Sequence, residues 1–264
     1  MMPDSPDPFL DKIAIVTGAS VGIGRSVALA LARRGTHVVL AARRTELLEQ
    51  VAGEIRSLDR EALAVTTDVT DQSQVNHMVD CAIERWGRVD ILVSNAGEMV
   101  RSYIDTLTVE YLQRSMAVNF YGGVHAILAV LPHMLQRGSG HIVAVTSMDG
   151  KLGTPKEVPY VTAKFAMTGF MEVLRQEMHG KGIYVSNVLP GRVDTALISN
   201  LKVHWIQPKM PPEAVARAIL RAIEKRKPEV IVPSLAILYH YIHTFSPLLS
   251  DWFARLFHLE GWEE

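Results

Sequence analysis

The chain has 264 residues, of which 48% are apolar and 21% charged, and its 27 Lys and Arg residues against 28 Asp and Glu residues leave a formal net charge of −1. This apolar content excludes a disordered chain, and the balanced charge without a long basic run argues against nucleic acid as a partner. A single cysteine, Cys81, excludes an intrachain disulfide and is typical of a reducing compartment. The N-terminal arm, residues 1–11, has no signal-peptide pattern, and no apolar run is long enough to span a membrane. We therefore expect a cytoplasmic protein.

Short β-branched runs alternate with longer helical patterns from Lys12 onward. Because each strand is followed by a helix, we expect an α/β fold with a doubly wound parallel sheet, right-handed crossovers and helices on both faces. No Gly/Ser-rich linker interrupts the pattern, so residues 1–264 are expected to form a single domain. Strands are predicted at 13–16, 37–40, 62–65, 89–93, 141–146, 183–189 and 230–232, and helices before Gly35, over 47–58, at 71–86, near 108–136 and at 159–179.

A glycine-rich loop follows the first predicted strand. The sequence from Thr17 to Gly24 reads TGASVGIG and leads directly into a helix. Its glycines allow a sharp backbone turn and let a phosphate approach the amide groups at the positive end of the helix. The spacing is G-x-x-x-G-x-G rather than G-x-G-x-x-G. The loop by itself leaves two alternatives, a dinucleotide site or a tight turn without a ligand.

The end of the second predicted strand bears on which dinucleotide would bind. Folds of this type that bind NAD place an acid about 20 residues after the glycines, where it holds the ribose 2′-hydroxyl. Here Ala41-Ala42-Arg43-Arg44 occupies this place without a carboxylate. A guanidinium can bind a 2′-phosphate with two hydrogen bonds, and both arginines lie at a helix N-terminus, where a cation is otherwise unfavourable. We therefore predict NADP in preference to NAD, the alternative being two solvated surface arginines.

A tyrosine and a lysine one helical turn apart provide a candidate acid–base pair. Tyr160 and Lys164 lie at i and i+4 at the start of a predicted helix and so share a face. An ammonium ~4 Å from the phenol, at an effective dielectric constant of ~20, is worth about 4 kcal/mol, which would lower the phenol pKa from ~10 towards neutrality. Ser147 follows a strand at the edge where open α/β sheets bind ligands, so its hydroxyl could contact a substrate carbonyl oxygen. Taken singly, these residues are equally well explained as a surface or core pair and a turn serine.

Together these motifs resemble, in order along residues 12–195, those of the short-chain dehydrogenase/reductase family. Thr17 through Gly24 matches the family's T-G-x-x-x-G-x-G, Asn95-Ala96-Gly97 matches its N-A-G, and Tyr160 with Lys164 matches its Y-x-x-x-K. The resemblance implies a Rossmann-type sheet of about seven strands. It also implies an oxidoreductase that transfers a hydride between a nicotinamide cofactor and a carbonyl or alcohol carbon.

The resemblance further implies roles for single residues. Tyr160 would exchange a proton with the carbonyl or alcohol oxygen, and Ser147 would orient that oxygen. Lys164 would lower the tyrosine pKa and bind the nicotinamide ribose, and Asn119 would hold a water that connects Lys164 to solvent. Val21 stands where some NADP-dependent members carry a basic residue, so the 2′-phosphate would rest mainly on Arg43. The expected catalytic residues are Asn119, Ser147, Tyr160 and Lys164, and the expected cofactor-binding residues are Gly18, Ser20, Gly22, Ile23, Gly24, Arg43, Asp68, Val69, Asn95, Ala96, Gly97, Tyr160, Lys164, Pro190, Val193 and Thr195.

Residues 196–212 take the place of the family's variable substrate loop. They are largely apolar and include Leu197, Ile198, Trp205 and Ile206. This composition leaves two alternatives. The loop could contact an apolar substrate such as a lipid, steroid, retinoid or aromatic ketone, or it could be a lid that packs on its own core.

A C-terminal extension, residues 233–264, follows the last predicted strand. Its residues 233–259 predict two short amphipathic helices separated at Pro247. These helices could cover the substrate pocket, pack in a subunit interface or lie on a membrane surface, so peripheral membrane association stays open. Their histidines lack a metal-ligand pattern, and no metal site is expected.

The predicted helices near 108–136 and at 159–179 resemble the pair through which family members dimerise. We expect a homodimer or homotetramer that acts on a small-molecule substrate, although intramolecular burial would equally explain the apolar side chains. A non-catalytic NADP-binding regulator on the same fold is the rival function, and a nucleotide-sugar epimerase or dehydratase is a second rival. A regulator needs only the nucleotide end, so the complete catalytic set favours the enzyme. The side chains that suit a subunit contact are Phe165, Phe170, Met171 and Leu174.

Overall fold

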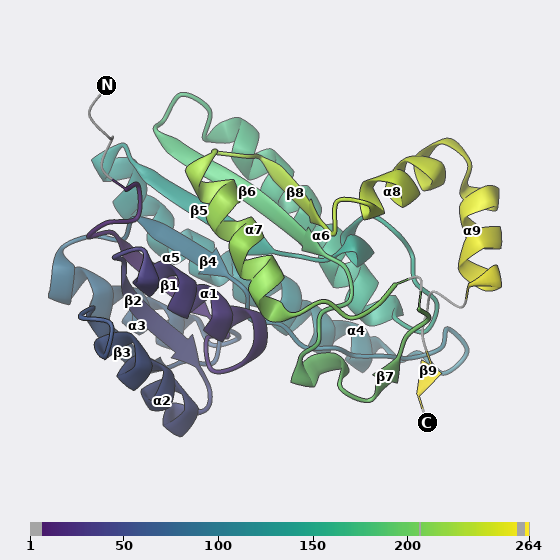
Figure 1. The fold of residues 1–264 in the computed structure, drawn as a ribbon, viewed down its shortest axis with the longest axis horizontal. Coiled ribbons are helices and arrows are strands. Elements are labelled where there is room, and N and C mark those ends of the chain that lie inside the picture. The colour runs from purple at the N-terminus through teal and green to yellow at the C-terminus, as the bar shows by residue number, and fades with distance from the viewer. Residues whose placement is uncertain (1–6, 206, 258–261, 264) are drawn as a thin grey trace.

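We describe the protein from a computed structural model, which describes residues 7–205, 207–257 and 262–263. A seven-stranded parallel sheet forms its centre, with the strands in the order β3-β2-β1-β4-β5-β6-β8 (Figure 1). The predicted doubly wound parallel sheet is thus confirmed. The strands are β1 (Ile13–Thr17), β2 (His37–Ala42), β3 (Ala62–Thr66), β4 (Ile91–Ser94), β5 (Gly140–Val145), β6 (Ile183–Pro190) and β8 (Glu229–Val232).

Helices cover both faces of this sheet, as Figure 1 shows. Three of them pack over each of the two cores, so each face of the sheet is buried. The first face carries α1 (Gly22–Arg33), α2 (Thr45–Arg56) and α7 (Pro212–Glu224), and the second carries α3 (Gln72–Trp86), α5 (Gly122–Arg137) and α6 (Val158–Glu177). A further helix, α4 (Val109–Met116), packs against α6.

The central strand β1 is apolar from Ile13 to Val16 because it is covered on both faces. Ala14 and Val16 belong to the core beneath α1, α2 and α7, whereas Ile15 belongs to the core on the opposite face. Because successive side chains of a strand point to opposite faces, a strand covered on both sides must be continuously apolar. All three side chains are 0% exposed.

Two predicted elements differ from the observed ones. The strand expected at 89–93 begins at Ile91. The Asp90 carboxylate just before it accepts hydrogen bonds from the Ile13 amide at 2.8 Å and from the Arg137 guanidinium at 3.1 Å. The helix expected near 108–136 is divided into α4 and α5 by a π-helical turn, Ala117–Tyr121. The other predicted strands and helices occur within a few residues of their expected bounds.

The continuous helical stretch Val109–Arg137 is, among the described helices, the one long and apolar enough to cross a membrane by length and composition. Ala126, Ile127, Val130 and Met134 on this stretch are 0% exposed and lie in the core on the α3, α5 and α6 face of the sheet. Packing within the fold therefore accounts for this buried part of the stretch, whereas Leu128 and Leu135 on the same stretch are exposed.

The C-terminal extension contains the two predicted short helices, α8 (Ala236–Phe245) and α9 (Pro247–Leu256), which are separated at Pro247 as expected. Figure 1 shows them beyond the carboxyl end of β8, to one side of the sheet. Two short strands, β7 (Leu201–Lys202) and β9 (Trp262–Glu263), pair antiparallel. Parts of three predicted segments lie outside the described residues, namely 1–6 of the N-terminal arm, Ile206 of the substrate loop, and 258–261 and 264 of the extension.

Candidate active site

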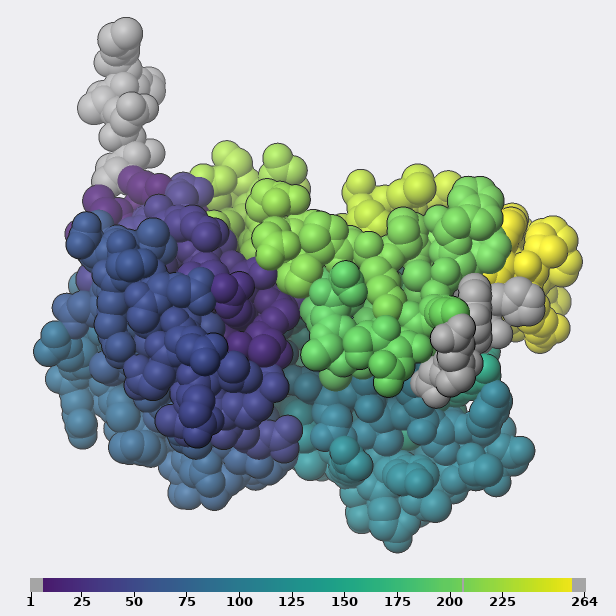
Figure 2. All heavy atoms as spheres, turned by 60° about the horizontal axis from the view of Figure 1, so that its bottom comes forward, coloured from purple at the N-terminus to yellow at the C-terminus, as the bar shows by residue number. Residues whose placement is uncertain are grey.

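The segments that follow β1, β4, β5 and β6 meet at the carboxyl edge of the sheet. β1 and β4 are neighbours there, although β2 and β3 lie between them in sequence. Open α/β sheets bind ligands in the crevice that such a reversal of strand order leaves. Figure 2 shows the green atoms of the segment after β6 beside the purple atoms of the β1–α1 region.

The β1–α1 loop requires glycine at two positions for different reasons. Gly18 has a positive φ of 66°, and a Cβ at this residue would lie 2.9 Å from the Cα of Ala96. Gly24, in the first turn of α1, has no room for a Cβ because the carbonyl group of Gly18 occupies that space. The loop therefore folds tightly over the N-terminus of α1, where no described side chain caps the first amides. This cradle fits the pyrophosphate of a dinucleotide.

The segment Asn95-Ala96-Gly97 fastens the end of β4 to the glycine loop. The Asn95 side chain donates a hydrogen bond to the Thr17 carbonyl at 3.0 Å. The amides of Asn95 and Ala96 donate to the Thr17 hydroxyl at 3.0 and 3.1 Å. Thr17 was not among the predicted site residues, although it is the first residue of the glycine motif. These hydrogen bonds hold the shape of the loop.

Two arginines follow β2 near the glycine loop. Arg43 is exposed. Its charge acts on Asp68, whose pKa is lowered mainly by hydrogen bonds from Thr70 and further by Arg43. Arg44 donates a hydrogen bond to the Ser20 hydroxyl at 3.3 Å. The structure thus brings Arg44 to the loop, whereas the sequence favoured Arg43 as the main anion-binding residue.

Ser147, Tyr160 and Lys164 come together at the carboxyl end of β5, where they are 6%, 6% and 4% exposed. Ser147 precedes the 3-10 turn η2 (Met148–Gly150), and the other two lie near the start of α6, which packs against η2. The Lys164 ammonium lies 5.5 Å from the centre of the Tyr160 ring and donates a hydrogen bond to the Val145 carbonyl at 3.2 Å. The predicted shared face of Tyr160 and Lys164 is therefore present.

Loss of solvation dominates the protonation of this pair. Burial raises the pKa of Tyr160 above its ordinary value, the Asp149 carboxylate raises it further, and the Ser147 hydroxyl opposes the rise. Burial lowers the pKa of Lys164 to about 8. The expectation that Lys164 brings the phenol pKa towards neutrality is thus wrong for this arrangement, because desolvation of the phenolate outweighs it.

Asn119 lies in the π-helical turn between α4 and α5 and is 3% exposed. Its side-chain amide donates to the carbonyls of Glu98 at 2.9 Å and Ser115 at 3.1 Å, and it accepts from the Glu98 amide at 3.1 Å. A Cβ at Gly97 would lie 3.1 Å from Asn119 Oδ1 and 3.8 Å from Lys164 Nζ. Gly97 therefore lets Asn119 and Lys164 approach each other, at a kind of turn that is frequent in functional sites.

A cavity of about 70 Å³ opens beside Ser147 and Tyr160. Its lining also includes Asp149 and Arg192, which the sequence analysis did not single out. The other lining residues come from the carboxyl edge of the sheet, from α1 and from the 3-10 turn η3 (Ala196–Ile198). They are Ile23, Met99, Thr146, Pro190, Gly191, Val193, Thr195, Leu197 and Ile198.

Behind this cavity lies a buried ion-pair cluster. Glu157, which is 0% exposed, pairs with Arg192 at 3.0 Å and with Arg101 at 3.6 Å. Burial raises the pKa of Glu157 to about 7, and the Asp149 charge raises it further, although both arginines oppose the rise. The cluster ties the segment after β6 to the residue that immediately precedes α6.

Residues 12–204 match the family model for short chain dehydrogenases. The chain belongs to the short-chain dehydrogenase/reductase family. It is 35% identical over 256 residues to the dehydrogenase/reductase SDR family protein 7-like of Drosophila melanogaster, which covers 91% of this chain and 78% of that protein. A short-chain dehydrogenase/reductase from Burkholderia phymatum in complex with NAD superposes with a TM-score of 0.84 at 24% identity. The match covers 91% of this chain and 95% of that chain. An alcohol dehydrogenase from Thermococcus sibiricus complexed with 5-hydroxy-NADP has a TM-score of 0.75 at 27% identity, covering 84% and 95%.

Family membership makes this chain an oxidoreductase with a nucleotide-binding Rossmann fold. Its substrate-loop segment both lines the cavity and packs on the protein. Ile198 and Leu201 are buried, whereas Trp205 is 78% exposed. The Lys209 ammonium donates a hydrogen bond to the Ile198 carbonyl at 2.8 Å, which fastens the segment to itself.

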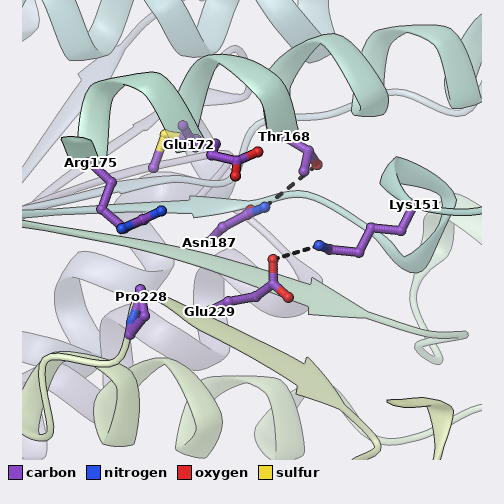
Figure 3. A pocket seen from close by; sticks show the side chains of 8 residues that line it. Lys151, Thr168, Glu172, Arg175, Asn187, Pro228 and Glu229 are labelled. Atoms are coloured by element: carbon purple, nitrogen blue, oxygen red, sulfur yellow. Dashed lines mark hydrogen bonds and ion pairs between the residues drawn. The ribbon is translucent and has the colours of Figure 1, made fainter. Parts of the chain in front are cut away.

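A larger cavity of about 250 Å³ in this short-chain dehydrogenase/reductase lies between α6 and the sheet edge at β6 and β8 (Figure 3). Lys151 and Glu229 face each other across it as an ion pair at 2.9 Å, and Glu172 and Arg175 project from α6 (Figure 3). None of the predicted site residues lines this cavity. The candidate active site is therefore the smaller cavity.

The α6 side chains expected at a subunit interface separate into two groups. Met171 and Leu174 are 1% and 6% exposed and belong to the core, against which Phe170 also packs. Phe165 is 45% exposed. Intramolecular burial therefore explains three of the four. Within the described residues, no group of three or more His, Cys, Asp or Glu side chains could hold a metal ion.

Proposed function

We propose that this chain is an NADP(H)-dependent oxidoreductase that transfers a hydride between the nicotinamide and a carbonyl or alcohol carbon, with Tyr160 as general acid and base. The observation that carries this proposal is the meeting of Ser147, Tyr160 and Lys164 at one small cavity on the carboxyl edge of the sheet. The cradle over the N-terminus of α1 opens on the same edge and supports dinucleotide binding there.

In carbonyl reduction, the Tyr160 hydroxyl donates its proton to the substrate oxygen, and Ser147 orients that oxygen beside it. Lys164 stabilises the phenolate that remains, and it also binds the nicotinamide ribose. Asn119 holds the water through which Lys164 exchanges protons with solvent. The bound nicotinamide supplies the hydride. Because burial favours the protonated phenol, Tyr160 carries the proton that this direction of the reaction requires.

Several parts of the chain would hold the dinucleotide. Gly18, Ser20, Gly22, Ile23 and Gly24 would surround the pyrophosphate, and Arg43 would bind the 2′-phosphate that distinguishes NADP from NAD. The hydrogen bond between Arg44 and Ser20 supports an anion site at the same place, because it aims a second guanidinium at the loop. The remaining contacts would come from Asp68 and Val69 at the adenine, Asn95, Ala96 and Gly97 along the dinucleotide, and Pro190, Val193 and Thr195 beside the nicotinamide.

An apolar substrate fits most of the cavity wall. Ile23, Met99, Leu197 and Ile198 contribute apolar side chains to it. This supports a lipid, steroid, retinoid or aromatic carbonyl compound. The test is NADPH consumption with a panel of carbonyl compounds matched in size. We expect faster turnover of aromatic ketones and long-chain aldehydes than of small polar carbonyls such as dihydroxyacetone. A preference for the small polar compounds would contradict this substrate class.

The exposed surfaces support further association. Phe165 on α6 and the exposed Leu128 on α5 lie on helices suited to form a homodimer or homotetramer. The exposed apolar side chains of α8 and α9 support contact with a second surface, either a subunit or a membrane, of a cytoplasmic protein. The rival reading, a non-catalytic NADP-binding regulator, does not account for Ser147, Tyr160 and Lys164 meeting in a cavity.

A further inference from the structure

The substrate loop forms one wall of the active-site cavity and is joined at its base. Leu197 and Ile198, on the 3-10 turn η3, line the cavity. At the two ends of the loop, Val193 and Met210 form a parallel bridge. The Lys209 ammonium donates a hydrogen bond to the Ile198 carbonyl at 2.8 Å. These contacts close the loop, and the position of its middle part depends on a different region of the chain.

The C-terminal extension contacts this middle part at two places. β7 pairs antiparallel with β9, so that Lys202 lies opposite Trp262 (Figure 1). Leu201, the first residue of β7, is 4% exposed. Two residues after Lys202, the centre of the His204 ring lies 5.8 Å from the centre of the Phe257 ring in an edge-to-face arrangement. Phe257 directly follows α9, so the loop is attached to both α9 and β9.

The extension is in turn anchored beside the catalytic residues. Ala236 and Tyr239 of α8 pack against a buried cluster that includes Met148, the residue that follows Ser147. The Tyr239 hydroxyl donates a hydrogen bond to the carbonyl of Ser250 on α9 at 3.2 Å, and Ser250 is 2% exposed. A continuous line of contacts therefore leads from the turn after β5, through α8 and α9, to the substrate loop.

The cavity in this arrangement is small for the substrates that its wall favours. Its volume is about 70 Å³. Sites for small organic ligands usually have roughly 300–1,000 Å³. The strands at the carboxyl edge are held by the hydrogen bonds of the sheet, whereas β7 and β9 are strands of only two residues each, and a pair of strands is marginally stable by itself. The substrate loop is therefore the wall that moves most easily to enlarge the cavity.

We propose that the C-terminal extension is a positioning element for the substrate loop: Phe257 and β9 hold the loop against the cavity, and release of these contacts enlarges the cavity for a bulky carbonyl substrate. The proposal rests on the proposed function, because it concerns the substrates of that reaction. A carbonyl compound small enough for the closed cavity needs no release, whereas a larger one does. The extension thereby selects substrates by size, in addition to the selection by the apolar wall.

Hydrogen exchange tests the attachment of the loop without turnover. Phe257→Ala removes the ring that contacts His204, and Phe245→Ala is the matched control, because Phe245 is 84% exposed at the end of α8. We expect the backbone amides of residues 196–205 to exchange about tenfold faster in Phe257→Ala and at the wild-type rate in Phe245→Ala. Unchanged exchange of this segment in Phe257→Ala would overturn the proposal.

A reversible cross-link tests the consequence for the substrate. Lys202→Cys combined with Trp262→Cys places thiols on residues that are paired across β7 and β9, and Cys81→Ser removes the chain's single native cysteine. Oxidation should slow NADPH consumption with a bulky aromatic ketone about tenfold and leave the rate with propanal within about twofold, because only the ketone requires the loop to open. Dithiothreitol should restore the ketone rate. Cys81→Ser alone, treated in the same way, is the control and should not respond to oxidation.

The outcomes separate the two proposals. An oxidised protein that reduces the ketone as fast as the reduced protein would contradict the role of the extension, and so would equal losses for the ketone and propanal. Failure of the two thiols to link would contradict the pairing of β7 with β9 on which the proposal depends. A wild-type protein that reduces neither compound would refute the proposed function, whereas unchanged hydrogen exchange would refute only the role of the extension.

Discussion

Tyr160 and Lys164 lie one helical turn apart, and both side chains have lost almost all contact with solvent. Desolvation acts oppositely on the two, because it penalises the anionic phenolate and the cationic ammonium. Tyr160 therefore holds its proton more firmly, and burial lowers the pKa of Lys164 to about 8. A lysine with such a pKa can exchange a proton with its surroundings near neutral pH, which fits the relay role that we propose for Lys164.

The choice of cofactor depends on single residues as well. Arg43→Ala should weaken NADPH binding about tenfold or more and leave NADH binding unchanged, because only NADPH carries the 2′-phosphate that the guanidinium would bind. Fluorescence titration of the reduced nicotinamide measures both affinities. Arg33→Ala, at an exposed position near the end of α1, is the control and should change neither. Equal weakening of both cofactors would contradict the assignment of Arg43.

Only some of the site residues could be predicted from the sequence. The strand end before Ser147 and the helical turn between Tyr160 and Lys164 are short-range features, and the family resemblance assigned the three residues to one site. Asp149 and Arg192 belong to segments that follow β5 and β6, and they meet because the sheet places these strands side by side. The charge of the cavity, and with it the protonation of Tyr160, therefore depends on tertiary packing that spacing does not reveal.

The elements themselves were largely predictable, because continuous apolar runs such as 13–16 indicate strands covered on both faces. The π-helical turn at Asn119 was not predictable. Its position depends on hydrogen bonds between Asn119 and Glu98, which belongs to the segment after β4. A long helical pattern contains no local signal for such a contact.

His141 of β5 and Ser186 of β6 form a buried polar contact that should make stability depend on pH. His141 is 6% exposed, and its Nε2 lies 2.8 Å from the Ser186 hydroxyl. That hydroxyl donates its own proton to the Lys227 carbonyl at 2.6 Å, so His141 Nε2 must be the donor to Ser186. Burial lowers the pKa of His141 to about 4.

The sign of the pH effect follows from that pKa. Between pH 6.5 and about 4 the unfolded chain binds a proton at His141 and the folded chain does not. As the pH is lowered through this range, His141 should therefore decrease the free energy of unfolding by about 3 kcal/mol. In His141→Gln this part of the decrease should vanish, whereas His179→Gln, at an exposed position, should retain it. Urea unfolding of the three proteins at pH 7 and pH 4.5 measures the difference. The same decrease in wild type and His141→Gln would contradict the account.

At the scale of the whole molecule, the apolar side chains lie in two kinds of environment. One part fills the buried clusters of the fold, and another part remains exposed, including many side chains of α8 and α9. Leu238 is 60% exposed on α8, and Phe245 and Leu248 are both 84% exposed where the two helices meet. Pro247 allowed the division into two helices to be predicted from sequence. What covers α8 and α9 could not be predicted from the sequence, because an amphipathic helix has the same pattern whether it contacts a subunit, a substrate or a lipid.

The most direct test of the central claim follows the hydride in the wild-type protein and in a variant that lacks the proposed proton donor. The wild-type protein is incubated with a ketone that it consumes and with NADPH deuterated at one face of C4 of the nicotinamide, and then at the other. The account predicts that one of the two forms delivers deuterium to the carbinol carbon. Tyr160→Phe should deliver none while binding NADPH as tightly as wild type, and Tyr241→Phe, at an exposed tyrosine of α8, should behave as wild type. Undiminished deuterium transfer by Tyr160→Phe would contradict the account.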